Sequence, residues 1–121
     1  MNRCIKNILK LICLLQNNSS SPCNNEDCTR PCLGPNINGI CYNTRVISLY
    51  TKNGTLFTTT YINSDNVEVT SSVFKVISVD NNVATLLILN DNNGEYLSTN
   101  NFITININCI CAIRCIVDVA I

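Results

Sequence analysis

Residues 103–121, at the C-terminus, place the strongest constraint on the fold of this chain. Every odd-numbered position in this run is apolar, and several even-numbered positions are polar, namely Thr104, Asn106, Asn108, Arg114 and Asp118. A strict period of two indicates a β-strand rather than a helix. A single strand of this length would extend about 60 Å, which is too long for a small domain. We therefore predict that a bend, bulge or turn interrupts it near residues 109–112.

The middle of the chain predicts further strands. Residues 45–51 and 55–62 flank Asn53-Gly54, a pair that favours a type I′ hairpin turn. Residues 67–79 form another extended run, and residues 83–89 are apolar enough for a strand buried on both faces. The acidic and glycine-containing residues 90–95 are interpreted as a hairpin turn, since they lack the spacing of a calcium loop. Residues 45–121 are thus expected to form an all-β domain, a sandwich or jelly-roll-like barrel of about seven or eight strands.

The N-terminal residues 1–44 divide into a helix and an irregular arm. Residues 1–16 predict a short amphipathic helix, with an apolar stripe formed by Ile5, Ile8, Leu9, Ile12 and Leu15. Two roles remain open for it: packing on its own domain or binding a partner. The run is too short to span a bilayer, and it lacks the cleavage site of a signal peptide. Residues 17–44 combine Asn, Ser, Pro and Cys without periodicity, which is typical of an irregular arm.

Nine cysteines lie near the two ends of the sequence. They are Cys4, Cys13, Cys23, Cys28, Cys32, Cys41, Cys109, Cys111 and Cys115. An odd number leaves at least one without a partner inside the chain, so an oxidised protein would hold a free thiol or an intermolecular bond. All nine are candidates for disulfides or cross-links. The last three also fit the simpler alternative of small core residues, because they share the apolar positions of the final strand.

The composition argues against several classes of chemistry. The 121 residues include no His, which excludes Ser-His-Asp and Cys-His catalysis and any His-ligated metal. The acidic residues form no paired constellation, and the cysteine spacings match neither a redox C-x-x-C nor the paired knuckles of zinc sites. We expect no enzyme, cofactor or metal site, with a Cys-cluster metal-binding domain as an alternative. The formal net charge of zero argues against nucleic-acid binding and favours association with other copies.

The C-terminal run resembles the signature of a known family. An alternating strand is followed by Cys109-Ile110-Cys111-Ala112-Ile113-Arg114-Cys115, as in the spore coat protein Y/Z family, which includes exosporium proteins of Bacillus-type spores. Pro31-Cys32-Leu33-Gly34 is similar to that family's Pro-Phe-Leu-Gly, with Cys32 in place of Phe. The runs at 43–54, 73–80 and 84–89 resemble its first hairpin and middle strands. This chain departs from the family in having no cysteine between Cys41 and Cys109.

The resemblance implies a structural role. Members self-assemble into cysteine-cross-linked arrays in the outer layers of the spore, and the cross-linking positions that the resemblance implies are Cys28, Cys109, Cys111 and Cys115. The expected partners are copies of the chain, in an extended lattice or filament, and other spore coat proteins. The expected location is the spore surface, after synthesis in the mother-cell cytoplasm without a signal peptide. The alternative function is a secreted disulfide-rich binding module.

Overall fold

The computed structural model describes residues 3–18 and 42–121. One helix, α1 (Arg3–Asn18), precedes seven strands, and a short 3₁₀ turn, η1 (Ile107–Cys109), separates the last two. The strands are β1 (Thr44–Thr51), β2 (Thr59–Ile62), β3 (Glu68–Ser71), β4 (Phe74–Asp80), β5 (Val83–Asn92), β6 (Glu95–Asn106) and β7 (Ile110–Val119). The prediction of an all-β domain with about seven strands and a short N-terminal helix is confirmed. The part of residues 17–44 predicted as an arm lies mostly outside the described residues.

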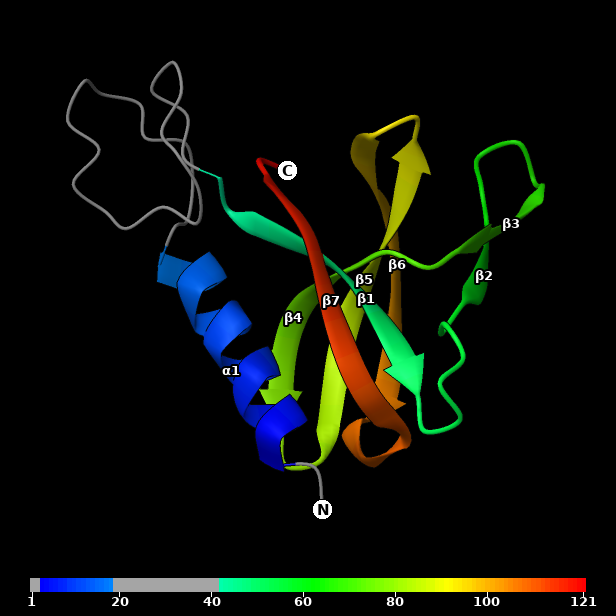
Figure 1. The fold of residues 1–121 in the computed structure, drawn as a ribbon. Coiled ribbons are helices and arrows are strands. Elements are labelled where there is room, and N and C mark those ends of the chain that lie inside the picture. The colour runs from blue at the N-terminus through cyan, green and yellow to red at the C-terminus, as the bar shows by residue number, and fades with distance from the viewer. Residues whose placement is uncertain (1–2, 19–41) are drawn as a thin grey trace, which may run out of the picture.

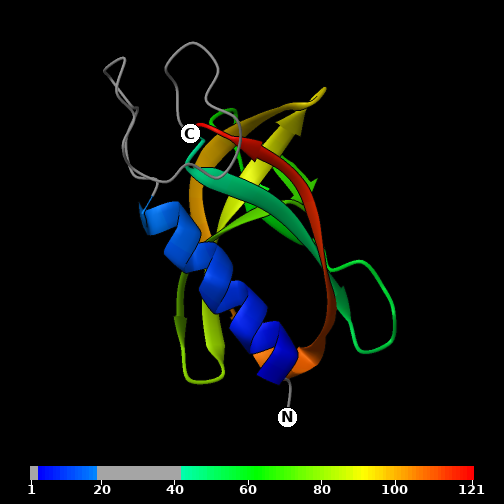
Figure 2. The same ribbon diagram turned by 60° about the vertical axis from the view of Figure 1, so that its left-hand side comes forward.

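Five strands form one antiparallel sheet in the order β6-β5-β4-β1-β7, and β2 pairs with β3 in a separate two-stranded sheet (Figure 1). The larger sheet is strongly twisted, and α1 lies across one of its faces (Figure 2). β5 is interior and buried on both faces, as its apolar sequence predicts. The edge strands of the larger sheet are β6 and β7, so the C-terminal run ends on an open edge.

The main core lies between α1 and the sheet. Ile5, Leu9 and Ile12 of the helix stripe are buried against apolar residues of β1, β4, β5 and the η1 turn. Tyr61 of β2 belongs to the same cluster, and Phe57 packs on Phe74 with ring centroids 5.5 Å apart. The helix therefore packs on its own domain, which decides one of the two roles that the sequence left open.

A glutamine side chain completes the sheet where two strands separate. β1 and β4 share one paired position, Ile47 with Phe74, and then diverge. The Gln16 amide fills the gap: its Nε2 donates to the Val76 carbonyl at 2.6 Å, and the Arg45 N–H donates to its Oε1 at 3.0 Å. Arg45 and Val76 are the residues that would face each other if the ladder continued by two positions. The helix thus supplies, through a buried side chain, the hydrogen bonds that the missing strand pairing would have made.

Asparagine occupies left-handed backbone positions in turns of both sheets and within β6. Asn66, Asn81, Asn93 and Asn100 all have positive φ, a conformation that Asn adopts more readily than most residues. Asn93-Gly94 connects β5 to β6 with both residues at positive φ, which is the geometry of a type I′ turn. This confirms a hairpin turn within residues 90–95.

The turn at Asn53-Gly54 differs from the prediction. Gly54 has positive φ but Asn53 does not, so the expected type I′ turn is wrong. The Gly54 N–H donates to the Thr51 carbonyl at 2.8 Å and the Thr51 N–H donates to the Thr55 carbonyl at 2.9 Å, as in a longer loop closed by a left-handed glycine. The returning chain bridges β1 at Leu56 and then leaves it, because β2 pairs with β3 instead.

The predicted interruption of residues 103–121 is present. The η1 turn separates β6 from β7, and the Asn108 N–H donates to the Asn106 side chain at its start. The same turn changes which residues face inward: Ile107 and Ile110 are buried, whereas Cys109 is exposed. Strict alternation therefore does not continue across the turn, and Cys109 leaves the apolar face that the pattern assigned to it.

Candidate cross-linking surface

Four of the described cysteines are exposed at the surface: Cys4, Cys109, Cys111 and Cys115. The alternative that the last three are core residues is wrong for this structure. Cys13 is half-buried on α1, and its thiol donates to the Ile77 carbonyl at 3.3 Å. The other predicted cross-linking residues, Cys23, Cys28, Cys32 and Cys41, lie outside the described residues.

Three of the exposed cysteines follow one another along the last edge of the sheet. Cys109 ends the η1 turn, and its carbonyl accepts from the Lys52 N–H at 3.2 Å. Cys111 occupies a bulge in the pairing of β7 with β1, and its thiol donates to the Thr51 carbonyl at 2.9 Å. Cys115 lies opposite Ile47, next to a second irregularity in the same pairing. The edge strand thus holds two thiols four residues apart, with a third just before it.

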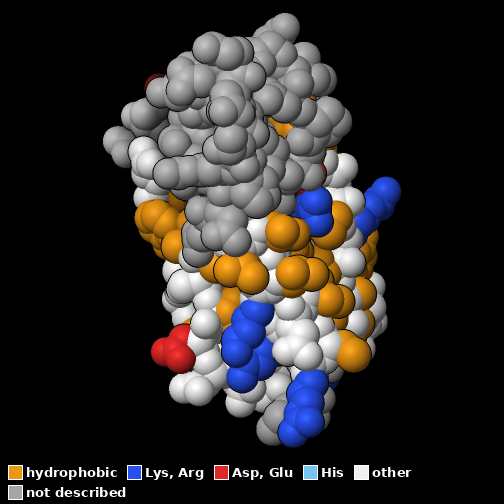
Figure 3. All heavy atoms as spheres, turned by 90° about the vertical axis from the view of Figure 1, so that its left-hand side faces the viewer, with side chains coloured by type: hydrophobic (Ala, Val, Ile, Leu, Met, Phe, Trp, Pro, Cys, Tyr) orange, Lys and Arg blue, Asp and Glu red, His pale blue; other side chains and the backbone are white. Residues whose placement is uncertain are grey.

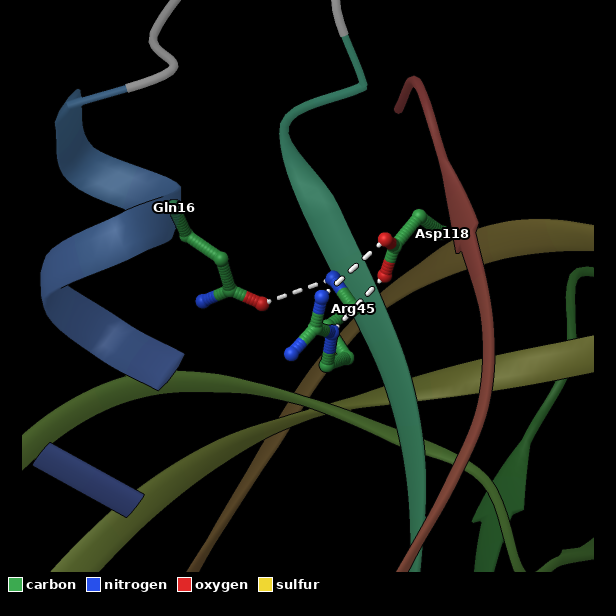
Figure 4. A network of polar contacts seen from close by, with 3 residues as sticks. All are labelled: Gln16, Arg45 and Asp118. Carbon is green, nitrogen blue, oxygen red and sulfur yellow. Dashed lines mark hydrogen bonds and ion pairs between the residues drawn. The ribbon is translucent and has the colours of Figure 1, made fainter. Parts of the chain in front are cut away.

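An ion pair ties the far end of β7 to β1. Arg45 and Asp118 face each other across the strands, and both carboxylate oxygens accept from the guanidinium, at 2.9 and 3.2 Å (Figure 4). The hydrogen bond to Asp118 raises the pKa of Arg45, burial works against this rise, and the nearby Cys115 thiol adds to it. The Asn43 side chain accepts a hydrogen bond from the N–H of Ile121 and donates one to its carbonyl. β7 is therefore held firmly to β1 while its outer edge has no strand partner among the described residues.

The two edges of the sheet differ in how open they are. On β6, pairing with β5 shifts between Leu87 and Leu89, opposite a stretch where Asn100 has positive φ. A hollow of about 250 Å³ beside β6 is lined by Leu97 and by Ile62 of β2, so the two-stranded sheet lies next to this edge. β7 has no such neighbour among the described strands. It is the more accessible edge for another chain.

The helix also has apolar side chains on its outer surface. Ile8, Leu11 and Leu14 are 42%, 56% and 56% exposed. Figure 3, which looks onto this side of the molecule, shows hydrophobic side chains gathered across the face, with Lys and Arg side chains below them and at the upper right. The apolar surface of α1 is therefore wider than the part of it that packs against the core.

Among residues 3–18 and 42–121, no group of three Cys, Asp or Glu side chains is arranged to hold a metal ion. The four cysteines outside these ranges leave the metal-binding alternative untested. No helix in the described part of the chain is long and apolar enough to cross a membrane.

These features define a class of protein: a small β-domain whose exposed reactive groups are thiols, on one edge of the sheet and on the N-terminal helix. The family model for spore coat protein Z matches residues 1–97. This chain therefore belongs to the spore coat protein Z family, and its role is that of a structural protein of the spore surface. No curated protein and no solved structure gave a match.

The family match and the cysteine motif of the resemblance lie in different parts of the chain. The match includes α1 and ends at Leu97 in β6, whereas the cysteine motif of the resemblance follows in η1 and β7. Two features of the structure were not predicted from the sequence. The bridging role of Gln16 has no local signal, and the exposure of Cys115 depends on β7 being an edge strand.

Proposed function

We propose that the chain is a building block of the outer coat or exosporium, which assembles with copies of itself and with other coat proteins and is then locked by disulfides. The observation that carries the proposal is the exposure of four thiols, Cys4, Cys109, Cys111 and Cys115, on a well-packed domain. None of these four is joined by a disulfide in the structure. Thiols in these positions are accessible to a neighbouring molecule.

Assembly precedes covalent locking in this proposal. The open edge of β7 and the exposed apolar side chains of α1 supply non-covalent contacts, because unpaired edges and apolar patches favour association. The zero net charge of the chain removes long-range repulsion between copies. Synthesis in the mother-cell cytoplasm, where thiols stay reduced, would let copies dock before they are cross-linked.

Locking is a thiol oxidation. Each bond forms from two thiols, which lose two protons and two electrons to dioxygen or to a small-molecule disulfide that enters the coat. Dissociation then requires reduction of the disulfide and no longer follows from dilution.

The test is electrophoresis of the purified full chain with and without reductant, combined with electron microscopy of the same sample. We expect a ladder of high-mass species that collapses on reduction, together with ordered sheets or filaments. A monomer band in both lanes, with featureless particles, would contradict the proposal and favour the secreted binding module. Fluorescent fusions imaged during sporulation test the location, which we expect to change from the mother-cell cytoplasm to the spore surface.

A further inference from the structure

We propose that β7 pairs with β7 of a second copy, antiparallel and centred on Ile113, so that Cys111 of each chain faces the partner's Cys115. This inference rests on the proposed function and specifies one of its cross-links. It identifies the partner as a second copy of this chain and the interface as a continuous sheet that passes from one molecule into the next.

The edge of β7 has few of the side chains that block other edges. Natural edge strands are usually blocked by Lys, by Pro, by inward-pointing charges, by β-bulges or by a covering segment. Of these devices, β7 has two bulges in its pairing with β1, at Cys111 and at Ile116. β7 has no Lys or Pro, and its Ile116 and Val117 are 40% and 41% exposed. Asp118 is paired with Arg45, so Arg114 is the one charge of β7 that no described ion pair compensates. A second strand can therefore pair with this edge, where each copy brings one uncompensated charge, that of Arg114.

The spacing of the cysteines selects the register. In an antiparallel pair with two-fold symmetry, residues at equal distances on either side of the central residue face each other. Cys111 and Cys115 lie two positions before and after Ile113, so each faces the partner's other cysteine, and one dimer gains two bonds. Registers centred on either cysteine give one bond between identical residues. Cys109 is excluded because it lies in the η1 turn, outside the extended strand.

The geometry of the sheet is compatible with these bonds. Residues facing each other in antiparallel strands have Cα atoms about 4.5–5.5 Å apart, within the range of disulfides. Ile113 packs against the main core, and Cys115 faces Ile47 of the same core, so both lie on one face of the sheet. Cys111 lies at a bulge, and its thiol must leave the Thr51 carbonyl of β1 to reach the partner strand. Within one chain, Cys111 and Cys115 are about 13 Å apart along an extended strand, too far for a bond. A bond between them is therefore between chains.

The chemistry uses a small-molecule disulfide as the oxidant. The Cys111 thiolate attacks it, forming a mixed disulfide and releasing one small thiol. The partner's Cys115 thiolate then attacks the Cys111 sulfur, and the second small thiol leaves. Two protein thiols are oxidised for each small disulfide that is reduced.

The bond can be assigned by isotope mixing and trypsin digestion. Equal amounts of unlabelled and ¹⁵N-labelled full chain, both with Cys109→Ser, are mixed under reducing conditions and then oxidised with a small-molecule disulfide. Trypsin cleaves after Lys75 and Arg114, so Cys111 falls in residues 76–114 and Cys115 in residues 115–121. We expect the two fragments to be linked, with mixed-isotope forms as abundant as the pure ones. Absence of this linked species, or pure forms alone, would overturn the inference.

Complementation tests the pairing of unlike cysteines. Cys111→Ser alone and Cys115→Ser alone should each lose the linked species, whereas an equal mixture of the two variants should regain it, with a single bond per dimer. A linked pair of identical 115–121 fragments from the Cys111→Ser chain would show pairing of like residues and contradict the register. As a marker of the centre, Ile113→Cys in a chain with Cys111→Ser and Cys115→Ser should cross-link to its own counterpart. Its failure to do so in a variant that unfolds cooperatively would contradict the two-fold arrangement.

The outcome separates this inference from the proposed function. A reducible ladder without the bond between Cys111 and Cys115 overturns only the inference, because other cysteines then make the cross-links. Loss of every reducible species overturns both.

Discussion

Gln16 has a larger structural role than its position at the end of a surface helix suggests. Its side chain is 4% exposed and satisfies one buried backbone donor and one buried backbone acceptor, at Arg45 and Val76. A buried polar group without a partner costs about 1–3 kcal/mol, which exceeds the net gain from a typical hydrogen bond. The loss of this one side chain would affect two strands.

Replacement of Gln16 tests this role. We expect Gln16→Ala to lower the free energy of unfolding by about 2–4 kcal/mol, because both backbone groups lose their partner. The measurement is urea unfolding of the reduced protein. Asn7→Ala, at an exposed position of the same helix, is the control and should change the value by less than about 0.5 kcal/mol. Equal effects of the two variants would contradict the bridging role.

Lys75 makes stability depend on pH. Burial lowers the pKa of Lys75 from its ordinary value of 10.5, and the nearby Cys13 opposes this shift. The folded protein therefore releases this proton before the unfolded chain does. Stability should rise with pH between the lowered pKa and 10.5, whereas below the lowered pKa the full cost of burying the charge remains.

Lys75→Met should remove this contribution. The variant should gain most over the parent below the lowered pKa, and the gain should shrink as the pH approaches 10.5. Urea unfolding from pH 7 to 10.5 with reductant measures the difference in the free energy of unfolding between the variant and the parent. The contributions of the thiols and tyrosines, which both chains share, cancel in this difference. Lys75→Arg is the matched control, because a guanidinium stays charged throughout. A constant difference between the Met variant and the parent would contradict the assignment.

At the scale of elements, α1 is part of the domain core and also part of its surface. Leu9 is fully buried against the sheet, whereas Leu14 of the same helix is 56% exposed. Burial of the inner stripe stabilises the fold, and the outer apolar side chains remain available for contacts with other molecules. One helix therefore combines both roles that its sequence allowed, the first in the structure and the second in the proposed assembly.

A matched pair of leucine substitutions separates the two roles. We expect Leu9→Ala to lower the free energy of unfolding by about 2–5 kcal/mol, because it leaves a cavity in the main core. Leu14→Ala should change it by less than about 0.5 kcal/mol. Under the proposed function, Leu14→Ala should instead slow assembly, measured by light scattering at equal protein concentration. A large loss of stability from Leu14→Ala would show that this side chain belongs to the core.

At the scale of the whole molecule, the fold places thiols outside and leaves folding to apolar burial. The main core contains none of the four exposed cysteines, and Cys13 is the only cysteine of the described residues that packs against it. Different cysteines can then form the cross-links without changing the fold of the domain. This division suits a subunit that folds first and is oxidised later.

The triple variant Cys109→Ser, Cys111→Ser, Cys115→Ser should therefore fold. We expect its free energy of unfolding, measured by urea unfolding with reductant, to agree with that of the parent chain within about 1 kcal/mol, because exposed positions tolerate polar replacement. Under oxidising conditions the resistance of its assemblies to heat and denaturant should fall. Loss of the cooperative unfolding transition would show that these residues stabilise the fold, and the cross-linking role assigned to them would fail.

Local patterns in the sequence predicted most of the secondary structure. Period-two alternation marked β1, β4 and the two parts of the C-terminal run, and a continuous apolar run marked β5. Asn and Gly marked the turns, because strand geometry and positive φ depend on neighbouring residues. The first half of β6, which is polar and bulged, gave no such signal. The type I′ turn was assigned to Asn53-Gly54 and is found at Asn93-Gly94, since the same dipeptide fits two kinds of loop.

The order of the strands was decided by long-range packing, which no local pattern encodes. β7 is exposed along one side because the sheet ends with it, and this position leaves the thiols of Cys111 and Cys115 at the surface. Gln16 acquires its role because the helix crosses the sheet where β1 and β4 separate. The residue types are known from the sequence, but their exposure depends on which elements lie beside them. Only the folded structure brings those elements together.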